Sequence, residues 1–145
     1  ALACEIWIGK EQRWKDNEFV IFRSDISSVV LYHHSDQWAS GSMERLLNTS
    51  VILIREFRTP ARTSDGYIHE VPGGSTRDLT RSAKQVAAEE VHEETGIILP
   101  SHRFQYVGTR QVAGTLSSYQ SNVYAVQLTH EEFAQARLLA GSIHG

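Results

Sequence analysis

The segment from residue 87 to residue 97 reads AAEEVHEETGI and holds four glutamates within six positions. If the segment is helical, Glu89 faces Glu93 at i,i+4 spacing, and Glu90 faces Glu94 in the same way. Like-charge pairs at this spacing destabilise a helix by roughly 0.2–0.5 kcal/mol each. A bound cation would remove that repulsion. On an acidic face without a cation, water would screen the repulsion but not remove it.

The surrounding residues predict a helix of three to four turns. Ser82 is a suitable N-cap, and Gly96 is a suitable residue just past the C-terminal end. One apolar side is formed by four residues at i, i+3, i+4 and i+8 spacing: Ala83, Val86, Ala87 and Val91. Glu90, Glu93 and Glu94 lie on a neighbouring arc, so their carboxylates can converge on one point.

The segments before this helix read as strands separated by turns. Alternation and β-branched residues predict strands at residues 5–10, 17–25, 25–34, 50–57 and 67–75. The near-continuous apolar run at 50–57, SVILIREF, predicts a buried strand. The strand at 67–75 is expected to stop at Pro72-Gly73-Gly74, and residues 35–48 read as a polar loop.

Two further strands and a final helix follow the glutamate segment. The strands are predicted at residues 103–114 and 121–129. Thr129 with Glu132 forms a capping box that opens a helix over residues 130–141. Strands interrupted by two helices indicate an α+β fold, with helices packed on a mixed sheet.

Length and composition exclude several classes of protein. The 145 residues suffice for one domain, residues 1–145, and are too few for two. A net charge of −3 offers no basic surface for nucleic acid, and the longest apolar runs are far below a membrane span. Cys4 is the only cysteine, which fits a reducing compartment, so we expect a cytoplasmic protein. Because the sequence does not begin with Met, we expect a trimmed piece of a longer chain.

Three carboxylates on one helical face beside Gly73-Gly74 suggest a site for a hard cation. Mg²⁺ prefers oxygen ligands, keeps several waters, and is usually held by a few carboxylates together with substrate phosphates. Mn²⁺ is a possible substitute. A solvated acidic helix face remains the alternative at this point.

The order of the residues resembles the Nudix box, G-x5-E-x7-R-E-U-x-E-E-x-G-U, in which U is a bulky apolar residue. Six residues occupy the E-U-x-E-E-x-G-U positions without a gap: Glu90, Val91, Glu93, Glu94, Gly96 and Ile97. The upstream ILIREFR and EVPGG resemble the branch that hydrolyses ADP-ribose and nucleotide sugars. The resemblance reaches from about Asp25 to about Thr129 and implies an α/β/α sandwich with a mixed central sheet.

The chain departs from the family pattern at two charged positions. Glu89 stands where the family has an arginine, and Arg81 stands where it has the upstream glutamate. In the family these two positions are thought to form a structural salt bridge, so the resemblance implies an Arg81–Glu89 bridge with exchanged signs. One extra residue also lies between Gly74 and Arg81.

The resemblance implies roles for individual residues. Glu90 and Glu94 are the first-choice Mg²⁺ ligands and catalytic residues, with Glu93 as a further ligand or a group that orients water. The backbone carbonyl of Gly74 would complete the metal site, since a glycine permits close approach.

Substrate contacts are implied for three residues of the upstream strands. Arg58 lies where relatives bind the diphosphate, Arg55 is an almost equal candidate, and Glu70 is expected to contact substrate. Without the resemblance, the arginines would be surface charges and Glu70 a strand-edge carboxylate. Relatives place the general base in a late acidic loop, but the corresponding residues 113–121 hold Gln120 and no acid. The base is therefore either a box glutamate or outside this chain.

The remaining histidines and aromatic residues do not indicate a second site. His33 and His34 lack a third zinc ligand nearby, and His92 is expected to be exposed. The three tryptophans, Trp7, Trp14 and Trp38, are interpreted as core or dimer contacts, while stacking roles for Phe57 and Tyr67 stay open. By resemblance, the N-terminal strands of residues 1–23 are expected to form a homodimer.

These observations predict Mg²⁺-dependent hydrolysis of a nucleoside diphosphate linked to another moiety, ADP-ribose or a nucleotide sugar first. The products would be a nucleoside monophosphate and a phosphorylated second product. Two alternatives remain at this stage. One is a pyrophosphohydrolase of RNA 5′ ends, against which the acidic net charge argues. The other is a Nudix-fold binding or scaffold protein that has lost turnover.

Overall fold

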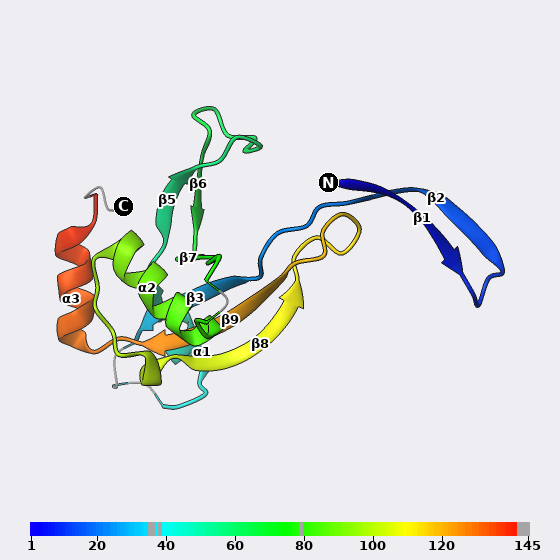
Figure 1. Ribbon diagram of the computed structural model, residues 1–145. Helices are drawn as coiled ribbons and strands as arrows, with labels where there is room; N and C mark the ends of the chain where they lie inside the picture. Colours follow the sequence, from blue (N-terminus) through cyan, green and yellow to red (C-terminus); the bar gives the residue numbers. More distant parts are fainter. Residues whose placement is uncertain (35–36, 38, 79, 142–145) are drawn as a thin grey trace.

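The computed structural model describes residues 1–34, 37, 39–78 and 80–141 (Figure 1). Its elements follow in the order β1 (Leu2–Ile8), β2 (Arg13–Val20), β3 (Ile26–His33), α1 (Met43–Leu47), β4 (Ser50–Val51), β5 (Ile54–Phe57), β6 (Tyr67–Glu70), β7 (Gly73–Gly74), α2 (Ala83–Thr95), the 3-10 turn η1 (Ser101–Arg103), β8 (Gln105–Gln111), β9 (Gln120–Gln127) and α3 (His130–Leu139). No helix of the described residues is long and apolar enough to cross a membrane.

The central sheet has the strand order β4-β3-β9-β8, and β7 also pairs with β3. Strands β3 and β9 are parallel over their length, from Ile26 opposite Ser121 to Tyr32 opposite Gln127. The other pairings in this sheet are antiparallel. The predicted α+β fold with a mixed central sheet is therefore confirmed.

The hydrophobic core lies between one face of this sheet and α2. Alternate residues of β3, Val29 and Leu31, are fully buried, whereas their neighbours in the strand are only half-buried. From α2, Ala87 and Val91 meet this face, and Phe104 closes it next to η1. Each such large side chain contributes about 1.5–3 kcal/mol by leaving water, so this contact fixes α2 on the sheet.

The boundaries of α2 are those that the sequence predicts. The hydroxyl of Ser82 accepts from the N–H of Gln85, and the Gln85 side chain accepts from the N–H of Ser82. Gly96 ends the helix in the left-handed conformation, with φ of 71°, which costs a glycine nothing. The apolar side is the buried one, so the predicted helix and its orientation are confirmed.

The final helix, α3, packs on the same core. Its predicted capping box is present, because Thr129 accepts from the N–H of Glu132 and Glu132 accepts from the N–H of Thr129. Phe133 and Ala136 are half-buried against the core residues. Arg103 of η1 donates to both carboxylate oxygens of Glu132, which ties the helix to the turn before β8.

The predicted buried strand at 50–57 is wrong in two respects. The run divides into β4 and β5, because the N–H of Ile52 bonds to Leu31 of β3 and the chain then leaves the sheet. Strand β5 pairs with β6 in a separate hairpin. Val51 and Leu53 are about half exposed, at 47% and 50%. A run of β-branched residues predicts a strand, but it does not predict whether other elements cover both faces of that strand.

Two smaller predictions also need correction. Within the predicted loop at 35–48, residues 43–47 form α1, because the hydroxyl of Ser42 caps the N–H of Arg45. Residues 35, 36 and 38 lie outside the described residues. The strand predicted at 67–75 ends at Glu70, and the following two glycines form β7 instead of a turn. This happens because Pro72 accepts from the N–H of Val29, which brings the chain onto β3.

The N-terminal strands form a hairpin that extends away from the body of the protein (Figure 1). Strands β1 and β2 form a sheet of their own, antiparallel and two-stranded. Trp7 and Trp14 lie opposite each other, with ring centroids 5.5 Å apart, and are 46% and 62% exposed. A core role for these two tryptophans is therefore wrong, and Trp38 lies outside the described residues.

Candidate active site

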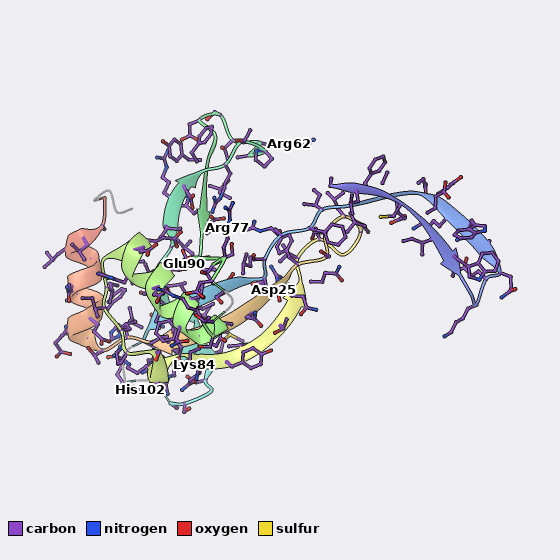
Figure 2. The ribbon with its side chains drawn as sticks, viewed as in Figure 1. Asp25, Arg62, Arg77, Lys84, Glu90 and His102 are labelled. Carbon is purple, nitrogen blue, oxygen red and sulfur yellow. The ribbon has the colours of Figure 1, made fainter. Side chains whose placement is uncertain are left out.

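Two carboxylates of α2 lie against the glycine strand β7, and Figure 2 labels one of them, Glu90. Glu94 Oε2 accepts a hydrogen bond of 2.8 Å from the N–H of Gly73. The carboxylate of Glu90 lies so close to Gly74 that a Cβ there would come within 2.5 Å of it. Gly74 in turn pairs with Ser27 near the start of β3. The packing of α2 on the sheet thus brings the two glutamates and the two glycines into one site.

The site disfavours negative charge on both glutamates. Burial, the largest cause, and the charges of Glu90, Glu56 and Glu70 together raise the pKa of Glu94 to about 7, against the lowering effect of the Gly73 hydrogen bond. Burial also raises the pKa of Glu90, with additions from Glu93 and Glu89. A proton or a cation is therefore needed to stabilise these carboxylates.

A guanidinium group reaches this site from the β5–β6 hairpin. Arg58 donates to Glu70 through Nε, at 3.0 Å, and through Nη2. Glu56 Oε2 lies 2.7 Å from the same Nη2. The Glu70 hydrogen bond is the main cause that raises the pKa of Arg58, and Glu94 is among the acids that add to it. Arg58 and Glu70 therefore lie within electrostatic reach of Glu94.

Arg55, the other arginine candidate, lies on the opposite face of the hairpin. Alternation along β5 leaves Arg55 and Phe57 exposed, while Glu56 is half-buried. The guanidinium of Arg55 pairs with Asp65 and lies 4.0 Å above the ring of Tyr67. The structure thus brings Arg58 to the acidic site and does not bring Arg55 there.

Glu93 and the Arg81–Glu89 pair lie outside the half-buried part of the site. Glu93 is exposed, as is His92, for which exposure was predicted. Arg81 donates to the carboxylate of Glu89, and its Nε lies 3.4 Å from Asp78. The side chains of Arg81 and Glu89 are 45% and 43% exposed, so solvent screens their attraction.

Glu56 is the site residue that the sequence analysis missed. Its position two residues before Arg58 places both on one face of an extended segment, and that spacing was a readable signal. The signal was hidden because the run at 50–57 was interpreted as a strand buried on both faces. Once β5 leaves the central sheet, its half-buried face becomes a wall of the acidic site.

The donor set fits a cation that takes part of its coordination from water and phosphate. Among the described residues, no three His, Cys, Asp or Glu side chains are placed to hold a metal by themselves. The carboxylates of Glu90 and Glu94 are half-buried, and nearby charges do not compensate their negative charge. Because Gly74 has no Cβ, the carboxylate of Glu90 can lie close to its backbone. Mg²⁺ suits such a set.

His33 makes other contacts. Its ring stacks on that of Phe133, with centroids 4.8 Å apart, and its Nδ1 lies 3.0 Å from the carbonyl oxygen of Leu128.

A double-mutant cycle on Arg81 and Glu89 is expected to give a small coupling. Arg81→Glu alone adds a carboxylate beside the acidic helix and should lower stability, while Arg81→Glu with Glu89→Arg should recover most of the loss. Because both side chains are well exposed, we expect a coupling of about 0.2–1 kcal/mol. Urea unfolding of the four proteins measures it, and strictly additive effects would show that the pair does not interact in solution.

The stability of the metal-free protein is expected to fall as the pH rises. A carboxyl whose pKa is about 7 in the folded state, against an ordinary 4.5, binds its proton more tightly when folded. The stabilisation is therefore present below the unfolded pKa and is lost as the pH rises through about 7. Since Glu94 is only half-buried, we expect a loss on the order of 1 kcal/mol. Urea unfolding in a chelator at two pH values measures it, and an equal slope in Glu94→Gln would contradict the assignment.

Comparison with known proteins gives similarity at the level of fold. No protein-family model matches the sequence, and no curated protein matches it. Among solved structures, an ADP compounds hydrolase aligns over 85% of this chain and 56% of its own, with a TM-score of 0.56 and 18% identity. A MutT/nudix family protein from Enterococcus faecalis aligns over 79% of this chain and 38% of its own, with a TM-score of 0.52 and 16% identity.

A third similar structure is the MERS1–RNA complex of T. brucei. It aligns over 74% of this chain and 35% of its own, with a TM-score of 0.55 and 14% identity. The chain therefore spans between 35% and 56% of the length of these three proteins. At such identities the likeness concerns the fold alone. This chain has a mixed α+β fold similar to that of Nudix/MutT proteins, and its chemistry has to be argued from its own site.

Proposed function

We propose that the chain is a divalent-cation-dependent hydrolase of nucleoside diphosphates linked to a second moiety, with ADP-ribose or a nucleotide sugar as the first candidates. The observation that carries the proposal is the half-buried pair Glu90 and Glu94 against Gly73-Gly74, with the guanidinium of Arg58 beside it. The likeness in fold to an ADP compounds hydrolase supports the same substrate class.

The residues of the site divide the work. Glu90, Glu94 and the backbone oxygen of Gly74 would hold Mg²⁺ or Mn²⁺, with Glu93 as a further ligand or a group that orients water. The bound cation would neutralise phosphate oxygens and lower the pKa of a bound water. Arg58 presents a planar guanidinium to the diphosphate, and Glu70 holds one edge of it.

The reaction is a hydrolysis in which the water oxygen bonds to phosphorus and the bridging P–O bond breaks. The water proton passes to a carboxylate of the site, and the leaving phosphate departs as an oxyanion. The products would be a nucleoside monophosphate and a phosphorylated second product. The half-buried site limits the access of bulk water, which strengthens the attraction between Arg58 and the phosphate oxygens.

The test is product release from a panel of ADP-ribose, nucleotide sugars and a 5′-triphosphorylated RNA oligonucleotide, with Mg²⁺ or with a chelator. We expect Mg²⁺-dependent release of a nucleoside monophosphate from at least one of the small molecules. Chromatography identifies the products, and Glu94→Gln serves as the inactive control. Release from the RNA alone would instead favour a pyrophosphohydrolase of RNA 5′ ends, an option kept by the likeness to the MERS1–RNA complex.

A binding protein that has lost turnover is the second candidate. It is favoured by the 113–121 segment, which carries no acid to serve as the general base that relatives place there. Titration calorimetry with ADP-ribose and Mg²⁺ separates the two. Tight Mg²⁺-dependent binding without any product would establish the binding function and exclude the hydrolase.

We further propose that the chain works as a homodimer joined through the β1–β2 hairpin. A two-stranded hairpin is marginally stable in water, and this one exposes Trp7, Trp14 and Phe19. A second copy that covers these side chains would remove their exposed surface from water. Light scattering at micromolar concentration is expected to give twice the chain mass, and Trp14→Ser should shift it toward the monomer. An active wild-type monomer would exclude this role.

A further inference from the structure

We propose that Glu56 is a positioning residue of this site: together with Glu70 it holds the guanidinium of Arg58, so that Arg58 leaves Glu94 free for the cation and keeps its open edge for a phosphate. The inference rests on the proposed function for the identity of cation and phosphate. Its geometric part rests on the contacts of the β5–β6 hairpin.

One carboxylate oxygen of Glu56 is buried, although the side chain as a whole is 39% exposed. Its Oε2 is buried and, among the described residues, accepts no hydrogen bond. The same oxygen lies 2.7 Å from Arg58 Nη2, so their contact is an ion pair without hydrogen-bond geometry. Burying an uncompensated carboxylate oxygen is unfavourable. Arg58 is therefore the partner that makes the burial of this oxygen tolerable.

Arg58 is held from two sides. The edge formed by Nε and Nη2 faces Glu70 on the neighbouring strand, while Glu56 approaches Nη2 from the same strand. No described residue accepts a hydrogen bond from Nη1, and the Arg58 side chain is 40% exposed, so the donors of Nη1 remain for a phosphate oxygen. A guanidinium is planar, and fixing one edge also fixes the direction of the other.

The two carboxylates compete with Glu94 for Arg58. The charge of Glu94 adds to the raised pKa of Arg58, after the larger effects of Glu70 and Glu56. Glu56 in turn raises the pKa of both Glu90 and Glu94, so it lies within electrostatic reach of the whole site. Without the charge of Glu56, Glu70 alone would hold Arg58. We then expect the guanidinium to turn partly toward Glu94 and to compete with the cation there.

The first test observes Arg58 directly, without substrate or turnover. Side-chain NMR of the arginine Nε–H groups is recorded for the full chain and for two variants. Glu56→Gln should shift the Arg58 signal and speed its exchange with water. Asp65→Asn is the matched control, because it releases Arg55 on the opposite face of the same hairpin and should leave Arg58 unchanged. An Arg58 signal that is unchanged in Glu56→Gln would overturn the proposal.

The second test uses Mn²⁺ alone as the probe, in a cycle of Glu56→Gln and Arg58→Gln. If Glu56 acts through Arg58, Glu56→Gln should weaken Mn²⁺ binding about tenfold in the wild type and less than about twofold when Arg58 is already glutamine. An equal loss in both backgrounds would show that Glu56 acts as a ligand or a plain charge, and the proposal would fail. The substrate panel is a separate measurement, so a chain that binds Mn²⁺ without turnover refutes the hydrolase but not the role of Glu56.

Discussion

Replacing Glu94 or Glu90 by glutamine is expected to lower turnover at least about 100-fold while the protein stays folded. Metal polarisation of a phosphate contributes several kcal/mol, and about 1.4 kcal/mol corresponds to a factor of ten in rate. Glutamine keeps the shape of the side chain and removes only its charge. Glu90 raises the pKa of Glu94, and Glu56 raises the pKa of both, so neutralising either carboxylate should leave the metal-free melting temperature equal or slightly higher.

The assay for these variants is monophosphate release under saturating Mg²⁺, with calorimetric Mn²⁺ titration in parallel. Glu44→Gln on α1 is the control, since this glutamate is exposed and belongs to a different helix. Full activity in either Glu90→Gln or Glu94→Gln would remove that residue from the set of metal ligands. A loss of activity accompanied by unfolding would instead point to a structural role.

Gly73→Ala is expected to lower the free energy of unfolding by about 2–4 kcal/mol, the largest effect on stability that we predict. A Cβ at this position would overlap the carbonyl oxygen of Ser27 and come within 2.8 Å of the Cα of Ser28. Both are backbone atoms of the central strand β3, so neither can move aside without breaking the pairing with β7. The N–H that Gly73 donates to Glu94 would be displaced as well.

Urea denaturation measures this loss against Gly108→Ala in β8. Gly108 has nothing within 4 Å of an added Cβ, so its substitution should change stability by less than about 0.5 kcal/mol. The stability of Gly74→Ala should differ from that of both variants, because its added Cβ meets the carboxylate of Glu90, a side chain that can move aside. Equal stabilities for Gly73→Ala and Gly108→Ala would contradict the packing described for β7.

Local signals in the sequence were sufficient to predict α2 and its site face. Ser82 and Gly96 fix the ends of the helix by their own hydrogen bonding and backbone conformation, and the apolar period fixes which side is buried. The two carboxylates that meet the glycine strand, Glu90 and Glu94, follow from that period. These features depend on neighbours close in sequence, so they can be predicted without a structure.

The partners of the hairpin residues were not predictable in the same way. Whether Arg55 or Arg58 faces the acidic site depends on where the chain leaves β3, and that point is set by one tertiary hydrogen bond from Ile52 to Leu31. Glu56 was missed for the same reason. A run of β-formers has the same appearance whether it continues in a sheet or turns away from it.

The parallel pairing of β3 with β9 has a consequence for the time course of folding. Residues near the start of β3 contact residues about 95 positions later in the chain, and the β5–β6 hairpin, α2 and β8 lie between them. Such distant contacts close a long loop before they gain any stabilisation, so they form slowly. During synthesis, the apolar side of α2 therefore has no complete sheet to cover it until β9 has left the ribosome. Over that interval we expect Val29, Leu31 and Val91 to be more exposed to solvent than in the folded protein, and the nascent chain to be most open to aggregation and to capture by chaperones.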